Sequence, residues 1–357
     1  MTTVSGMNYA PKGKSAPVCA AGDFAFAAIG LDHGHIYGMC NGLTEAGGRL
    51  RWVYDNDPAR AEALAVQFPG AKLATGEAQV LEDPGIQLVA SAGVPVDHAS
   101  LGTRVMRHGK DYFTDKPAMT TLGQLEEAKA VVAETGRKYA VYYSERVHVE
   151  SAVFAGQLVH GGAIGRVVQV LGMGPHRPSL ASRPPWFFDK QRYGGILCDI
   201  GSHQAEQFLF FTGNTDARVT ASRVANYAHK QYPGLEDFGD CTLVGQNGAT
   251  GYFRVDWFTP GGLGTWGDGR VFILGTDGYI ELRKYVDVAR EPGGDHVYLV
   301  DGRGEHYLAV EGKVGYPFFG ELVLDCLART DRAMSQAHAF KAAELCLTAE
   351  QQAERME

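Results

Sequence analysis

An alternation of apolar runs and amphipathic segments between residues 23 and 145 constrains the fold of this chain most strongly. The apolar runs, FAFAAIG at 24–30 and IQLVASAG at 86–93 among them, are nearly continuous, which is typical of strands buried on both faces. Helical patterns separate them, for example DPARAEALAVQFPG at 57–70. The alternation predicts a parallel sheet covered by helices on both faces.

The pattern changes after a predicted helix at 148–162, because strands then follow one another through glycine-rich turns. We therefore expect three parts. Residues 1–22 form an extension or arm, either lying on a partner subunit or disordered. Residues 23–145 form the parallel-sheet domain. Residues 146–357 form an α+β domain with a large open, mainly antiparallel sheet, whose C-terminal helices either stay with it or pack back on the first domain.

Composition excludes several classes of protein. A net charge of -8 over 357 residues argues against a nucleic-acid partner. The six cysteines form no C-x-x-C pair, so neither a zinc site nor a disulfide framework is expected. We expect no secretory signal and no membrane span, because no apolar stretch is long enough. These features favour a cytoplasmic protein with reduced thiols.

The stretch GLDHGH at 30–35 lies where a dinucleotide-binding fold has its glycine-rich phosphate loop. Gly30 suits the tight turn, but Asp32 and His35 replace the second and third glycines of G-x-G-x-x-G. Gly34 offers a close approach one turn later, and His33 and His35 are candidate donors to phosphate oxygens. The helix N-terminus supplies amide donors. These residues alone leave open whether the fingerprint is a variant, broken or absent, and only residues farther along the chain favour a variant.

Asp55 ends the next predicted strand, at the right distance to accept hydrogen bonds from an adenosine ribose. An acidic residue there favours NAD over NADP, whereas Asp57 before Pro58 suits a helix cap. The candidate cofactor-binding residues are Gly30, Asp32, His33, Gly34, His35, Ile36, Asp55, Ala92, Gly93 and Lys116.

Three residues carry the chemistry. Lys116 follows a strand and so lies at the carboxyl edge of the sheet, where an ammonium can stabilise an alkoxide. Asp199 and His203 are four residues apart at the start of a helix, so the carboxylate can orient the imidazole as a base. Glu206 extends this face and leaves a metal site as an alternative. We expect no metal, and Lys116, Asp199 and His203 are the catalytic candidates.

The segment GPHRPSLASRPPWFFDKQRYGG at 174–195 combines aromatic and cationic side chains. Such a mixture suits the hydroxyls and the C–H face of a sugar or cyclitol, although a surface loop packed on its own aromatics is equally compatible. The candidate substrate-binding residues are His176, Arg177, Trp186, Arg192, Tyr193, Asp199 and His203.

From residue 23 onward the chain resembles the Gfo/Idh/MocA oxidoreductases. The resemblance rests on the Gly30 loop, Asp55, TDKPAM at 114–119, GGILCDIGSHQAEQFLFFTG at 194–213 and LGTDGYIEL at 274–282. It implies a Rossmann domain, an open C-terminal sheet used for a homodimer or homotetramer, and a catalytic Lys116, Asp199 and His203. His203 would be the acid/base, Asp199 its partner and Lys116 the hydroxyl ligand. The Glu-Lys-Pro of that family is Asp115-Lys116-Pro117 here.

The leading hypothesis is an NAD-dependent dehydrogenase that moves hydride between nicotinamide and a secondary hydroxyl of a sugar, cyclitol or glycoside. A second hypothesis is an enzyme that oxidises its substrate only transiently, and then eliminates, epimerises or transfers without net redox. A third is a regulatory protein that senses NAD without catalysis, against which the presence of all three catalytic candidates counts.

Overall fold

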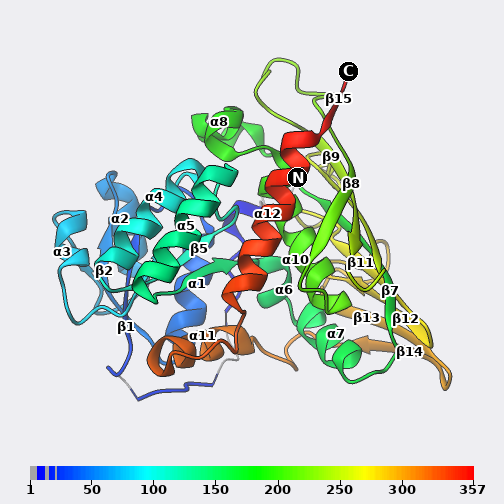
Figure 1. Ribbon diagram of the computed structural model, residues 1–357, viewed down its shortest axis with the longest axis horizontal. Coiled ribbons are helices and arrows are strands. Elements are labelled where there is room, and N and C mark those ends of the chain that lie inside the picture. The colour runs from blue at the N-terminus through cyan, green and yellow to red at the C-terminus, as the bar shows by residue number, and fades with distance from the viewer. Residues whose placement is uncertain (1–5, 13–15, 21) are drawn as a thin grey trace. The chain divides into compact units, whose positions relative to one another are not determined.

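The computed structural model describes residues 6–12, 16–20 and 22–357 and separates into two compact units (Figure 1). The first, which we call the parallel-sheet unit, comprises residues 7–142 and 315–340. The second, the mixed-sheet unit, comprises residues 143–314 and 341–357 together with Gly6. Within the described residues, every helix is too short or too polar to cross a lipid bilayer.

The parallel-sheet unit contains six strands in the order β3-β2-β1-β4-β5-β6, all parallel. Its strands are β1 (Ala25–Ile29), β2 (Arg49–Tyr54), β3 (Lys72–Leu73), β4 (Leu88–Ser91), β5 (Asp111–Asp115) and β6 (Tyr139–Tyr142). Its helices are α1 (His35–Glu45), α2 (Pro58–Gln67), α3 (Glu77–Leu81), α4 (His98–Arg107), α5 (Leu122–Thr135) and α11 (Pro317–Ala328), with a 3-10 turn at Pro95–Asp97.

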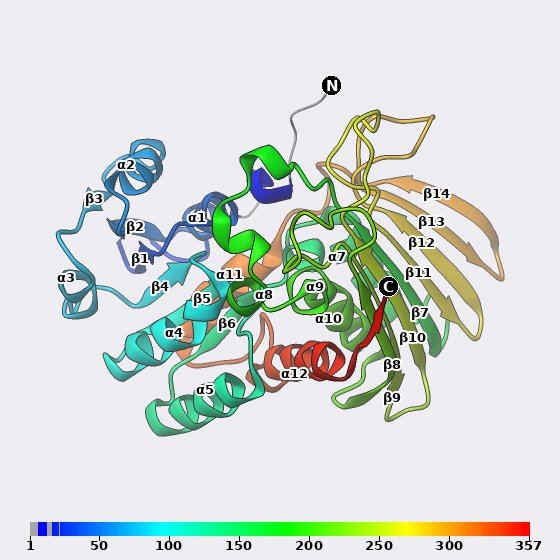
Figure 2. The ribbon, with the colours of Figure 1, turned by 90° about the horizontal axis from the view of Figure 1, so that it is seen from above.

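Every residue of β1, β4 and β5 is buried, because helices cover both faces of this sheet. Figure 2 shows α4 and α5 on one face and α1 and α11 on the other. The strand order reverses between β1 and β4, so their carboxyl ends form the crevice in which such sheets bind ligands. The predicted Rossmann domain is confirmed.

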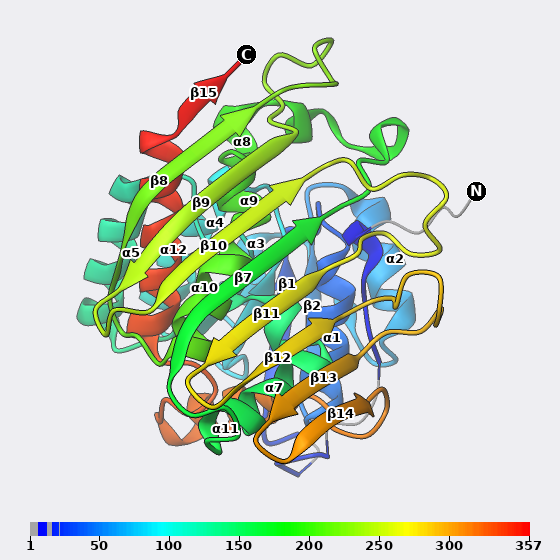
Figure 3. The same cartoon turned by 90° about the vertical axis from the view of Figure 1, so that its right-hand side faces the viewer.

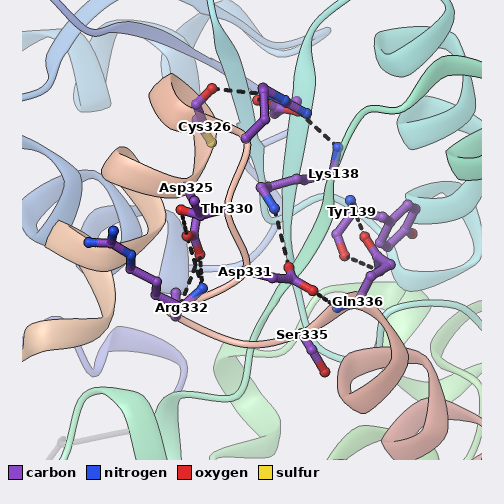
Figure 4. Close-up of polar contacts among 12 residues, drawn as sticks. Lys138, Tyr139, Asp325, Cys326, Thr330, Asp331, Arg332, Ser335 and Gln336 are labelled. Atoms are coloured by element: carbon purple, nitrogen blue, oxygen red, sulfur yellow. Dashed lines mark hydrogen bonds and ion pairs between the residues drawn. The ribbon is translucent and has the colours of Figure 1, made fainter.

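The segment before α12 (Gln336–Gln352) is fastened to β6 and β5 by side chains (Figure 4). Gln336 exchanges hydrogen bonds with the backbone of Tyr139 at 2.8 and 2.9 Å. Arg329 binds both carboxylate oxygens of Asp111, at 2.6 and 2.9 Å. Asp325 accepts hydrogen bonds from the Arg332 and Ala333 amides. Residues far along the chain thus complete the parallel-sheet unit.

Apart from Gly6, the described residues of the N-terminal arm also belong to this unit. A Cβ at Gly34 would lie 2.2 Å from the carbonyl oxygen of Met7, so only glycine allows the arm to cross the start of α1. Asn41 donates to the Pro11 carbonyl at 3.4 Å, and the Val18 amide donates to the Ala46 carbonyl at 2.9 Å. Residues 7–12 and 16–20 therefore lie along α1, whereas residues 1–5, 13–15 and 21 of the predicted arm lie outside the described residues.

The mixed-sheet unit is built on nine strands in the order β14-β13-β12-β11-β7-β10-β9-β8-β15. They are β7 (Val167–Pro175), β8 (Ala217–Ala225), β9 (Phe238–Gly245), β10 (Thr250–Asp256), β11 (Arg270–Gly275), β12 (Gly278–Arg283), β13 (His296–Asp301), β14 (Gly304–Ala309) and β15 (Glu354–Met356). The pairs β7–β10 and β8–β15 are parallel and the other pairs are antiparallel. The predicted open, mainly antiparallel sheet is confirmed.

Helices cover one face of this sheet, and Figure 3 shows the opposite face bare of helices from β8 to β14. The helices are α6 (Ser144–Val147), α7 (Glu150–His160), α8 (Lys190–Tyr193), α9 (Ile196–Asp199), α10 (Gly201–Thr212) and the part of α12 from residue 341, with 3-10 turns at Leu180–Ser182 and Pro185–Phe188. Glycines let α10 approach the sheet closely, since a Cβ at Gly251 would meet the Phe208 ring at 2.6 Å. A Cβ at Gly172 would likewise meet Gln204 Oε1 at 2.3 Å.

Candidate functional site

The turn after β1 brings the two strands of the crevice together. Gly30 has a φ of +73°, and a Cβ there would lie 3.3 Å from the Cα of Gly93. The Ala92 amide donates to the Gly30 carbonyl at 3.0 Å, and the His33 amide donates to the Ala92 carbonyl at 2.8 Å. The loop thus requires glycine at position 30 for both backbone conformation and space. This agrees with the role that the sequence predicts for Gly30.

Gly34 lies where the arm crosses the loop. It is the N-cap of α1, and the arm residue Met7 fills the space beside it. The close approach that Gly34 permits is therefore that of the chain's own backbone. The buried Ile36 follows in the first turn of the helix. The first amides of α1 donate within the loop, that of His35 to Nδ1 of His33 and that of Ile36 to the His33 carbonyl, both at 3.3 Å.

Asp55 is buried at the end of β2 and organises the loop. Its carboxylate accepts hydrogen bonds from the amides of Leu31 and Asp57, both at 2.7 Å. The Arg60 guanidinium lies 2.8 Å from the same carboxylate and 3.3 Å from Asp32. Arg60 thus offsets part of the negative charge that Asp32 would present to a pyrophosphate. Asp57 caps α2 through the Ala59 amide, as predicted.

The two loop histidines face Asp115 at the end of β5. Nδ1 of His35 lies 2.9 Å from Oδ1 of Asp115, and Nδ1 of His33 lies 3.3 Å from Oδ2. Burial alone would raise the pKa of Asp115, but His35, His33 and Lys116 together hold it well below its ordinary value. Three ligand atoms within 4.8 Å of one another are compatible with a metal, yet Lys116 adds positive charge beside them. Hydrogen bonding within the cluster accounts for the arrangement.

Lys116 is buried at the carboxyl end of β5, and its peptide bond to Pro117 is cis. His98 is a further residue at this edge, which sequence reasoning missed. Its ring nitrogens lie 2.8 Å from the Pro117 carbonyl and 3.0 Å from the Gly93 carbonyl, so it connects the ends of β4 and β5. A histidine inside an amphipathic helix gives no sequence signal for such a role.

In the mixed-sheet unit, α9 ends at Asp199 and α10 begins two residues later. His203 is 2% exposed, and the Tyr143 ring meets it edge to face at 6.5 Å. Glu206 pairs with Arg146 at 2.6 Å, which explains its burial without a metal. Asp199 is half-buried and is the charge that opposes the effect of burial on Arg183, whose pKa falls to about 10.

The predicted substrate residues have different surroundings. His176 is buried against Trp266 at 4.5 Å and Trp257 at 5.5 Å, and Trp186 is also buried. Arg177 donates to the carbonyls of two residues in the 260–263 loop. Tyr193 is in the core, where its hydroxyl contacts backbone of residues 234 and 236. Arg192 is exposed.

Sequence reasoning missed a buried polar group beside His203. Glu145 lies 2.8 Å from Nζ of Lys284 and accepts a hydrogen bond from Gln204 at 2.9 Å. Lys284 has no exposed side-chain surface. A single lysine after a strand is usually a surface residue, so nothing in the sequence indicates this pair.

This geometry fits a dinucleotide in the parallel-sheet unit, because a backbone turn that a Cβ would fill lies beside an acidic strand end and the start of a helix. Comparison with known proteins agrees. Residues 26–143 match the oxidoreductase family with an NAD-binding Rossmann fold, and residues 153–281 match the GFO/IDH/MocA C-terminal domain. The chain belongs to the Gfo/Idh/MocA oxidoreductase family.

A crystal structure from Erwinia carotovora atroseptica, described as an oxidoreductase, is 53% identical, with a TM-score of 0.91 over 94% of this chain and 100% of that chain. The scyllo-inositol 2-dehydrogenase (NAD(+)) of Bacillus subtilis is 26% identical over 79% of this chain and 78% of its own length. A second scyllo-inositol 2-dehydrogenase of that organism, which uses NADP(+), is 25% identical over 47% of this chain and 46% of its own length. The class predicted from the sequence, an NAD(P)-dependent dehydrogenase, is confirmed.

Proposed function

We propose that this protein oxidises a secondary hydroxyl of a sugar, cyclitol or glycoside with NAD. The observation that carries the proposal is the pairing of a dinucleotide loop with a buried histidine that follows an aspartate by four residues. The loop is built on Gly30 and Asp55, whereas Asp199 ends α9 and His203 lies in the first turn of α10. The scyllo-inositol dehydrogenase relatives support a polyol as the substrate class.

NAD, when bound, supplies a nicotinamide ring that accepts hydride from the substrate carbon. The residues that would hold it are those of the β1–α1 loop. Gly30 gives the backbone its turn, and the positive end of the α1 dipole would attract the pyrophosphate. Asp55, whose carboxylate accepts from the Leu31 amide, would also accept from a ribose hydroxyl. His33 and His35 are donors to phosphate oxygens, and the backbone at Ala92 and Gly93 forms the other wall of the crevice.

His203 takes the proton from the reacting hydroxyl oxygen. Asp199 keeps the imidazole in the orientation and tautomer that accepts this proton, and also binds the substrate. Lys116 donates a hydrogen bond from Nζ to the same oxygen and stabilises the negative charge that develops there. In the reverse direction His203 returns the proton to the carbonyl oxygen as reduction proceeds.

We also propose that NAD is preferred over NADP, because a buried carboxylate at position 55 repels a 2′-phosphate. Arg60, whose side chain is 40% exposed, already lies against Asp55 and so offsets part of this repulsion. The preference is therefore expected to be moderate. Replacement Arg60→Ala should raise the Kd for NADP more than the Kd for NAD.

The aromatic cluster around His176 is the proposed substrate wall. Trp257, Trp266 and Phe187 supply apolar faces, and Arg183 lies over two of these rings, 4.4 Å from the Phe187 centroid and 4.8 Å from that of Trp257. Flat apolar faces beside buried polar groups suit a cyclitol or a pyranose, which presents C–H faces and hydroxyl edges. Trp186 of the predicted set belongs to the same cluster through its contact with Phe187.

We propose that the bare face of the nine-stranded sheet in Figure 3 joins copies of this chain as a homodimer or homotetramer. Leu171, Tyr252, Leu274 and Tyr279 are exposed there, each by 36–39%. A groove of about 300 Å³ crosses β7, β10, β11 and β12. Light scattering should give the mass of a dimer or tetramer for the wild type. Tyr252→Arg should give a smaller mass, because the interface is disrupted.

Replacing His203 and Lys116 tests the proposed chemistry. His203→Ala should lower kcat by about 100- to 10,000-fold, because a general base is lost, and Lys116→Met should also lower kcat. Both should bind NAD in calorimetry with a Kd near that of the wild type. Full turnover in both variants would contradict the assignment, and Arg303→Ala, at a side chain that is 77% exposed, is a control expected to keep its kcat.

A further inference from the structure

The chain that leaves β6 packs against the start of α10 through consecutive contacts. The Tyr143 ring meets the His203 ring edge to face, Glu145 accepts a hydrogen bond from Gln204, and Arg146 pairs with Glu206. Three contacts to a single helical turn restrict both its rotation and its translation. The turn that carries His203 is thus fixed by residues 143–146.

Glu145 differs from the other contacts because it belongs to a buried charge pair. Its side chain is 2% exposed, that of Lys284 is not exposed at all, and their charged atoms are 2.8 Å apart. Oε2 receives both Lys284 and Gln204, whereas Oε1 accepts no hydrogen bond from the described residues. Removing two charges from water costs several kcal/mol per ion, so stability alone is a weak reason to keep such a pair.

The charge on Glu145 is permanent near neutral pH. Burial would raise its pKa, but Lys284 and then His203 and His176 lower it to about 2. Because the interaction between two charges is mutual, the negative charge of Glu145 also favours the protonated form of His203. The positive charge of Lys284 favours the neutral form of His203. The other titratable or charged groups that face this turn are Tyr143, Asp199 and the Arg146–Glu206 pair.

We propose that Glu145 and Lys284 are positioning residues which hold the turn of His203 and set the pH at which its imidazole exchanges a proton. The assignment of His203 as the base rests on the proposed function, whereas the charge coupling is a property of the free protein. Gln204 connects the two, because it follows His203 on α10 and binds Glu145 through its amide nitrogen. The Gln204 side chain packs against the backbone of Gly172, where a Cβ would lie 2.3 Å from Oε1.

An NMR titration of the free protein tests the coupling without a substrate. The ring protons of the 12 histidines are followed with labelled histidine, and His203→Gln assigns the signal. Glu145→Gln should move the midpoint of His203 to lower pH by about 1 unit, because a neighbouring negative charge is lost. Lys284→Met should move it to higher pH, and the double variant should fall between them. Arg303→Met, which breaks an exposed pair with Asp301 in the same unit, should leave the midpoint unchanged.

The opposite directions separate this role from a structural one. Unchanged midpoints, or shifts in the same direction for both single variants, would overturn the inference. Melting temperatures and NAD calorimetry show which variants are folded, and Glu145→Asp serves where Glu145→Gln fails to fold, with a smaller shift expected. If the NMR shifts occur but His203→Ala keeps full turnover, the coupling stands and the proposed function fails. If His203→Ala is inactive but no shift occurs, only the coupling fails.

Discussion

Two buried carboxylates organise the two units, and they differ in what partners them. Asp115 in the parallel-sheet unit faces two imidazoles, those of His33 at 3.3 Å and His35 at 2.9 Å. Glu145 in the mixed-sheet unit faces one ammonium, that of Lys284 at 2.8 Å. Both carboxylates have a lowered pKa despite their burial.

The two carboxylates therefore fix different elements through different partners. The Asp115 cluster holds the phosphate loop against the end of β5 through two imidazoles. Glu145 holds α10 through Gln204 and is itself paired with an ammonium. The loop binds and releases a cofactor, whereas α10 carries the proposed base. The partners of Asp115 and Glu145 differ accordingly. The predictions below test the contrast in order of expected effect.

The largest effect is expected for Gly30→Val, which should raise the Kd for NAD by about 100-fold or more. A β-branched residue is strained at a φ of +73°, and its Cβ would press on Gly93. Calorimetry measures the Kd, and Gly70→Ala is the control, because Gly70 also has a positive φ but nothing within 4 Å of a Cβ. Wild-type affinity in Gly30→Val would contradict the placement of the loop.

A smaller effect is expected for Asp115→Asn, which should lower the free energy of unfolding by about 1.5–3 kcal/mol at pH 7. The folded pKa of Asp115 lies below its unfolded value, so its contribution is present above about pH 4 and is lost as pH falls below that. The difference in the free energy of unfolding between the wild type and Asp115→Asn, measured with denaturant, should therefore be smaller at pH 3 than at pH 7. A difference that is larger at pH 3 would contradict the ion pairing.

The smallest effect is expected for an exposed carboxylate. Asp57 is 47% exposed in its side chain and caps α2 through a single amide. Asp57→Ala should lower the free energy of unfolding by about 1 kcal/mol, and Asp57→Ser should restore most of it. Thermal melts of the three proteins measure this, and a loss as large as that of Asp115→Asn would remove the contrast between buried and exposed carboxylates.

Much of the parallel-sheet unit could be predicted, because its information is local. Apolar runs give the strands, and the turn after β1 places Gly30 within a few residues of α1. Contacts between residues far apart in the sequence could not be predicted. Met7 lies against Gly34 and leaves no space for a side chain there, and nothing in the sequence pattern indicates this contact. The spacing of residues in the sequence also gives no indication that Arg60 contacts Asp55 and Asp32.

The mixed-sheet unit shows the same limit more strongly. The helix of His203 follows from its own pattern and ends at Gly213 as expected. Glu145 and Lys284 are 139 residues apart, so only the fold brings them together. Arg177 and Tyr193 look like ligand contacts in a list of residue types, but their polar atoms contact neighbouring backbone. Residue type thus predicts the chemistry of a segment. Tertiary packing determines which of its side chains can contact a ligand.

The central claim is net oxidation of a polyol by NAD, and one absorbance measurement tests it most directly. The wild-type protein is mixed with NAD and a panel of inositols, aldoses and glycosides, and the absorbance of reduced nicotinamide is followed. The account predicts NADH accumulation with at least one member and none with the same member and His203→Ala. Tight NAD binding with no NADH from any member would contradict it and favour an enzyme that oxidises its substrate only transiently.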